Sequence, residues 1–118
     1  MPPLGRKSLT ELKSEGFSFE CDGDLYEAPE GTLNDGLTDA EINMTTIGEA
    51  KSVEIINDSS TSGDDFTVKF NATTNDAVTI KQGETRTFSK FPITRIFFSN
   101  SSGSNIPFRT FIMGYRNR

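Results

Sequence analysis

After residue 50, the apolar residues of this chain occur in short runs, about ten residues apart, with turn-forming residues between the runs. Phe66, Val68 and Phe70 alternate with polar residues, which is the period of a strand that buries one face. An amphipathic helix would need apolar residues on every third or fourth position, and this region has no such spacing. The pattern predicts six strands, at Ser52–Asn57, Phe66–Phe70, Ala77–Ile80, Thr85–Phe88, Ile93–Ser99 and Phe108–Tyr115.

The connections between these runs predict how the strands pair. They are short and polar, whereas parallel neighbours need crossover connections of about a dozen residues or more. We therefore expect an all-β fold, either a small antiparallel β-sandwich or a jelly-roll-like barrel of about six strands, with an extended N-terminal arm.

One face of each strand is expected to form the core. Phe97 and Phe98 are adjacent, so they point to opposite faces. We place Phe98 in the core and expect Phe97 to contact a partner chain. On the last strand, Phe111, Met113 and Tyr115 share one face. The core set on two strands is Phe66, Val68, Phe70, Ile96 and Phe98, and the outward set is Thr67, Lys69 and Arg95.

The first 50 residues have a different composition. They contain eleven Asp and Glu against three Lys and Arg, a net charge of −8, whereas residues 51–118 carry +3, and the two sum to −5. Eight of the ten Phe lie after residue 50. We therefore divide the chain into an acidic extended arm, residues 1–50, and a β-sandwich domain, residues 51–118. The arm is expected to lie on a neighbouring subunit or on a basic partner surface.

A short helix is expected within the arm. Ser8-Leu9-Thr10-Glu11 is a capping box, and Gly16 ends the run after Glu15. So short a helix is marginal in water unless its apolar face packs on something. We therefore expect Leu9 and Leu12 to contact a partner, together with Tyr26 farther along the arm. A core of 68 residues supplies only about 3–5 kcal/mol, which also favours a dimer or trimer.

The residue types exclude most enzyme chemistry. The chain has no His, no Trp and one Cys, which rules out His acid-base catalysis, Cys-His nucleophiles and an intrachain disulfide. Asp58–Gly63 begins like a calcium loop, but Lys69 stands where that loop requires a Glu ligand. Cys21–Asp24 offers two carboxylates, too few for a metal site. A carboxylate pair for glycoside hydrolysis lacks an aromatic sugar platform. We expect no enzymatic activity, no metal and no cofactor.

Nucleic acid and membrane are not expected partners either. Arg109, Arg116 and Arg118 are interleaved with aromatic residues, as in stacking platforms for single strands. The net charge of the chain is −5, however, and so few cations neutralise few phosphates. No window has the apolar length of a membrane span, and the first residues lack the apolar stretch of a secretion signal.

One succession of segments resembles a known family. A strand ending in Asn57-Asp58-Ser59 precedes the alternating Phe66–Phe70, Ile80–Glu84 turns at Gly-Glu into the Phe-rich Phe91–Ser99, and Phe108–Tyr115 closes on Gly-Tyr. This pattern, over residues 50–116, resembles small β-sandwich virion structural proteins of tailed bacteriophages. Such proteins decorate or cement capsids, or serve in the tail and collar as adaptors and fibre anchors. The resemblance implies no catalytic residues and leaves residues 1–50 outside it.

We therefore expect a non-enzymatic virion structural protein, first of all a capsid decoration or cement protein that stabilises the head by binding neighbouring subunits. The alternatives are a tail, collar or fibre-anchoring adaptor, and a carbohydrate- or protein-binding β-sandwich module. The expected partners are further copies of the chain and the major capsid protein or another virion protein, in a virion assembled in the host cytoplasm. Exposed aromatic residues at the loop tips would favour the binding module.

Overall fold

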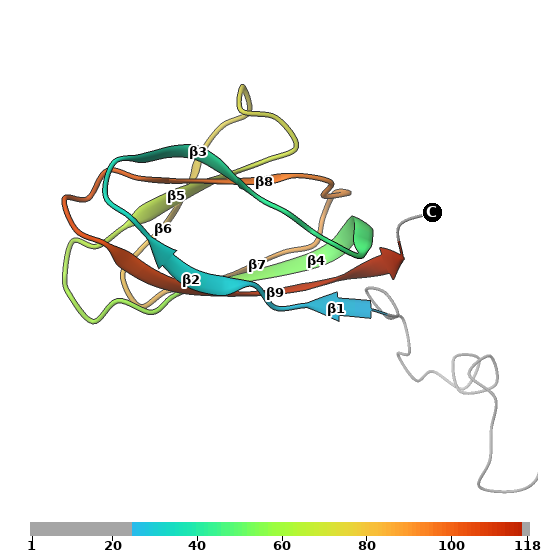
Figure 1. The fold of residues 1–118 in the computed structure, drawn as a ribbon, viewed down its shortest axis with the longest axis horizontal. Helices are drawn as coiled ribbons and strands as arrows, with labels where there is room; N and C mark the ends of the chain where they lie inside the picture. The colour runs from blue at the N-terminus through green and yellow to red at the C-terminus, as the bar shows by residue number, and fades with distance from the viewer. Residues whose placement is uncertain (1–24, 117–118) are drawn as a thin grey trace, which may run out of the picture.

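The computed structural model describes residues 25–116, and within them every regular element is a β-strand (Figure 1). One sheet has the order β1-β9-β4-β7, with β2 also paired to β9, and the second has the order β3-β8-β5-β6. All strand pairs are antiparallel. The strands are β1 (Leu25–Glu27), β2 (Glu30–Leu33), β3 (Leu37–Ile42), β4 (Ile47–Asn57), β5 (Phe66–Phe70), β6 (Val78–Ile80), β7 (Thr85–Phe88), β8 (Ile96–Asn100) and β9 (Ile106–Arg116).

The strand pairs are nested. β5 pairs with β6, β4 with β7, β3 with β8, and β1 and β2 in succession with β9. The chain thus follows one long hairpin centred on the β5–β6 connection, and successive pairs of that hairpin alternate between the two sheets (Figure 1). This arrangement is a jelly roll in which β1 and β2 share one strand position. The small antiparallel β-sandwich expected from the sequence is confirmed.

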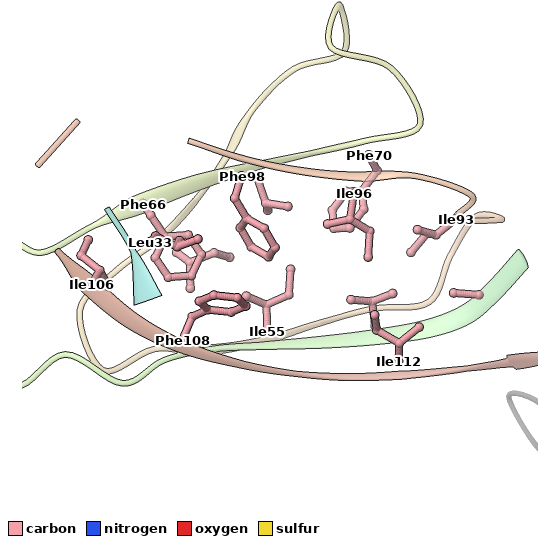
Figure 2. Close-up of a cluster of buried hydrophobic side chains, with 14 of the residues drawn as sticks. Leu33, Ile55, Phe66, Phe70, Ile93, Ile96, Phe98, Ile106, Phe108 and Ile112 are labelled. Atoms are coloured by element: carbon pink, nitrogen blue, oxygen red, sulfur yellow. The ribbon is translucent and has the colours of Figure 1, made fainter. Parts of the chain in front are cut away.

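The core lies between the two sheets, as Figure 2 shows. Phe66 and Phe98 from one sheet point toward Phe108 from the other. The ring centroid of Phe98 lies 5.5 Å from that of Phe66 and 5.2 Å from that of Phe108. The expected core set of Phe66, Val68, Phe70, Ile96 and Phe98 is confirmed, since all five are buried there.

The division of the chain at residue 50 is wrong, because the sandwich already begins with β1. Residues 25–46 contain β1, β2 and β3, and β4 runs across the expected boundary. Leu33, Ile47 and Ala50 are buried in the core. These early strands carry few apolar residues and depend on backbone pairing with β8 and β9, which leaves no local signature. The sandwich therefore has nine strands in the described residues instead of about six. The helix expected at residues 8–15 lies outside them.

Some of the acidic residues before residue 50 pair with basic residues after it. The Asp39 carboxylate lies 3.2 Å from Lys69 Nζ. Glu41 on β3 accepts two hydrogen bonds from the Arg95 guanidinium, at 2.9 and 3.1 Å. Acidic side chains from before residue 50 thus bind basic side chains from after it, and residues 25–50 are strands of the sandwich instead of an extended arm that lies on another subunit.

Candidate functional site

A strip of apolar side chains lies along β1 and β9 on the outer face of the five-stranded sheet. Tyr26 on β1 is 68% exposed, and Phe111 and Tyr115 on β9 are 37% and 43% exposed. The register places Tyr26 opposite Met113, which stands between Phe111 and Tyr115 on the same face. The Tyr26 ring stacks on Phe111, with 5.1 Å between centroids and 22° between planes. We call these four residues the aromatic strip.

The strip follows from the two-residue period of β9. Phe108 and Ile112 point into the core, so Phe111, Met113 and Tyr115 must point out of the sandwich. The sequence correctly predicted that these three residues share a face, but it did not show that the face is exposed. Contiguous exposed apolar side chains on a sheet mark an interaction surface.

Charged side chains of β4 border the strip. Glu54 lies opposite Phe111, and Glu49 lies opposite Tyr115 and forms an ion pair with Lys51. The strip is therefore bordered on its β4 side by charged side chains.

Glu27 fixes β1 and, with it, the adjacent Tyr26. Its carboxylate accepts hydrogen bonds from the backbone N–H groups of Thr45, Thr46 and Ile47 and from the Thr45 hydroxyl. Partial burial acts to raise the pKa of Glu27, but these hydrogen bonds favour the charged form and together hold the pKa below its ordinary value. One side chain therefore ties β1 to the β3–β4 connection.

We expect Glu27→Gln to lower the free energy of unfolding at pH 7 by about 1–2 kcal/mol, because the amide accepts fewer and weaker hydrogen bonds. The folded-state pKa lies below the unfolded value of about 4.5, so the stabilisation by the carboxylate is complete above that value. It is lost as the pH falls through the folded-state pKa. The difference between wild type and variant in urea unfolding should therefore shrink as the pH falls below about 4.5. A difference that stays constant with pH would contradict this role, and Glu30→Gln, on an exposed carboxylate of β2, is the control.

The expected partner contact at Phe97 is wrong. Phe97 is only 4% exposed, although it points away from the main core cluster. The Arg95 guanidinium lies over its ring, 4.8 Å from the centroid, and Glu41 and Lys69 stand opposite it on the neighbouring strands. Long charged side chains can cover an aromatic ring with their aliphatic stems while their charges stay in water. This intrachain cover leaves Phe97 no free surface for a partner.

Of the remaining expected contacts, Tyr26 is exposed and belongs to the aromatic strip. Leu9 and Leu12 lie outside the described residues. Phe111 and Tyr115 were not among the expected contacts, although both are exposed, and their shared face was the signal that could have singled them out.

The loop that begins like a calcium site is engaged in internal contacts. The Asp58 carboxylate accepts two hydrogen bonds from the Arg109 guanidinium, at 2.7 and 2.9 Å. The Ser59 hydroxyl donates to Asp64 Oδ2 at 2.7 Å. Within residues 25–116, no three His, Cys, Asp or Glu side chains gather where they could hold a metal ion. No helix in this part of the chain is long and apolar enough to cross a membrane.

A second surface feature lies where β5 and β7 end and β6 begins. It is a pocket of about 200 Å³. Phe70 stands against two other rings, with centroids 4.7 Å from Phe88 and 5.5 Å from Phe91. Phe91, in the β7–β8 connection, is partly exposed. The residues that line the pocket are Phe70, Asn71, Asn75, Asp76, Val78, Phe88 and Phe91.

Comparisons with known proteins assign no family. No protein-family model matches the chain, and a search of curated proteins finds no match. Among solved structures, the chain is similar to the solution NMR structure of a de novo designed double-stranded beta-helix, at 21% sequence identity and a TM-score of 0.46. That similarity covers 73% of this chain and 97% of the designed one.

Proposed function

We propose that this chain is a non-enzymatic structural protein of a bacteriophage virion, and that it binds a neighbouring subunit through the aromatic strip. The observation that carries the proposal is the exposed stack of Tyr26 on Phe111, continued along β9 by Met113 and Tyr115. Soluble monomers rarely expose large contiguous apolar surfaces, and Tyr is one of the residue types that dominate binding energy at interfaces. Association would remove the strip from water.

The virion assignment is supported by the resemblance of residues 50–116 to small virion structural proteins and by the use of jelly rolls in viral capsids. Because a fold alone does not define a function, the surface has to carry the role. The first proposal is a capsid decoration or cement protein, and the alternative is a tail, collar or fibre-anchoring adaptor. In each case the proposed partners are further copies of this chain, as a dimer or trimer, and the major capsid protein or another virion protein.

A second candidate function is a carbohydrate- or protein-binding β-sandwich module. The observation that favours it is the pocket beside Phe91, because ligand pockets are concave and are lined by aromatic side chains with a few polar groups.

Tyr26→Ala should weaken self-association about 30-fold, which is the effect of losing an interface residue that contributes about 2 kcal/mol. Because Tyr26 is mostly exposed, the variant should fold normally. Light scattering over a range of micromolar concentrations measures the association. Thr79→Ala, on an exposed residue of β6 in the other sheet, is the control. A 13 kDa species at every concentration for the wild type, or equal association of wild type and Tyr26→Ala, would refute the proposed contact.

A cryo-EM map of the native particle tests the virion role directly. We expect the jelly roll to lie with its five-stranded sheet against a neighbouring subunit, with Tyr26 and Phe111 in the contact. A particle that lacks this chain would contradict the virion role. A particle in which that sheet faces solvent would contradict the docking surface while leaving the virion role intact.

A further inference from the structure

The polar side chains that line the pocket beside Phe91 are only partly used in hydrogen bonds within the chain. Asn71 Nδ2 donates to the Pro92 carbonyl at 2.9 Å, and Asn71 Oδ1 accepts from the backbone N–H of Thr94 at 2.8 Å. Asn75 Nδ2 donates to the Phe70 carbonyl at 2.7 Å. The second N–H of each amide, the oxygen of Asn75 and the carboxylate of Asp76 have no hydrogen-bond partner among the described residues, and the carboxylate is the only charged group of these.

Asp76 is exposed, and within residues 25–116 no Lys or Arg forms an ion pair with it. A ligand that pairs with the Asp76 carboxylate must supply a hydrogen-bond donor. A cationic donor suits this group best, because hydrogen bonds between charged partners are the strongest.

The floor of the pocket also favours a cation. Phe70, Phe88 and Phe91 present three phenyl rings with tilted or edge-on mutual packing. An aromatic ring attracts a cation to its face. Phe88 already binds one cation in this way, since the Arg86 guanidinium lies over its ring, 5.5 Å from the centroid. Arg86 does not line the pocket.

The size of the pocket restricts the ligand further. About 200 Å³ is less than the volume of a typical site for a drug-sized molecule. It suits one long side chain whose aliphatic stem lies on the rings while its charged end reaches the carboxylate.

We propose that this pocket binds the side chain of a lysine or arginine of a protein partner. The stem packs on Phe70, Phe88 and Phe91, and the charged group pairs with Asp76. The site is separate from the aromatic strip, so it can be tested independently of the virion proposal.

The test is an NMR titration of the isotope-labelled full chain with N-acetyl-lysine amide as the probe. We expect millimolar binding, with shift changes confined to the backbone amides of residues 70–78 and 88–91. N-acetyl-norleucine amide has a similar stem without the ammonium group, and it should bind about tenfold more weakly because it loses both the ion pair and the cation–π contact. A methyl pyranoside tests the sugar-binding alternative.

Two variants separate the two contacts. Asp76→Asn should raise the dissociation constant of the lysine probe about fivefold and leave that of the norleucine probe unchanged. Phe91→Leu keeps an apolar surface for the stem but removes the ring, and it should weaken the lysine probe about threefold and the norleucine probe less than that. Glu30→Gln, outside the pocket, is the charge-matched control. Equal binding of the two amides, shifts produced by the pyranoside alone, or no shifts from the lysine probe would overturn the proposal.

Discussion

Replacing Phe98 by alanine should lower the free energy of unfolding by about 3–5 kcal/mol. Phe98 is fully buried, and its ring lies between Phe66 of its own sheet and Phe108 of the opposite sheet (Figure 2). Truncation removes the contacts of β8 with both layers and leaves a cavity that the closely packed rings cannot fill. Denaturant unfolding measures the loss, which is a large part of the roughly 5–15 kcal/mol that stabilises a typical domain.

Phe97→Ala is the matched control on the same strand. Phe97 is almost as well buried, but the side chains that cover it include the flexible Arg95, which can move into the vacated space. We expect a clearly smaller loss than at Phe98. Equal losses, or a larger one at Phe97, would mean that the outer face of β8 contributes as much packing as the core.

Gly114→Ala should be the most damaging glycine substitution in the sandwich, with a loss of about 3 kcal/mol, at the upper end of the range for overpacking. A Cβ at Gly114 would overlap the carbonyl oxygen of Glu49 and would lie 2.7 Å from Ile47 Cγ2 and 2.9 Å from Ala50 Cα. Two of these three atoms belong to the backbone of β4. Relief would require β4 and β9 to separate next to the register shifts of that pair.

Gly31→Ala is the control for this substitution. Gly31 also lies in a strand paired with β9, but the nearest atom to its added Cβ is Phe108 Cε1 at 3.7 Å, an ordinary contact. We expect a change within about 0.5 kcal/mol. If thermal unfolding shows similar effects for the two variants, the close approach of β4 to β9 at Gly114 is not as tight as described.

The five core residues on β5 and β8 were predictable because their signal is local. Phe66, Val68 and Phe70 alternate with polar residues, and a one-residue shift of register would expose the whole set. On β9, apolar residues stand on both faces, and local alternation does not show which of the two faces is buried. Phe111 and Tyr115 therefore needed the sandwich itself to show that β9 turns them outward while Ile112 fills the core.

The candidate site was predictable only in part. Tyr26 was expected to contact a partner because it is an apolar residue in an acidic segment, and the structure exposes it. Its stacking on Phe111 arises from the pairing of β1 with β9, which joins the two ends of the described chain. No sequence pattern near Tyr26 contains that pairing. The expectation for Phe97 failed for the same reason, since its cover comes from two other strands, β3 and β5, and from the loop before β8.

The sequence by itself determined the strand type, the antiparallel sandwich and the buried face of its most apolar strands, because these depend on the period of neighbouring residues and on short polar turns. Only the tertiary structure decided that residues 25–50 belong to the sandwich and that Asp39 and Glu41 pair with basic residues from the later part of the chain. Glu41 and Arg95 are 54 residues apart, and their bidentate contact exists only once β3 lies beside β8. A charge difference between two halves of a sequence is the same whether the halves bind each other or another molecule. Only the long-range pairing of β3 with β8 shows that these acidic and basic residues meet within one chain.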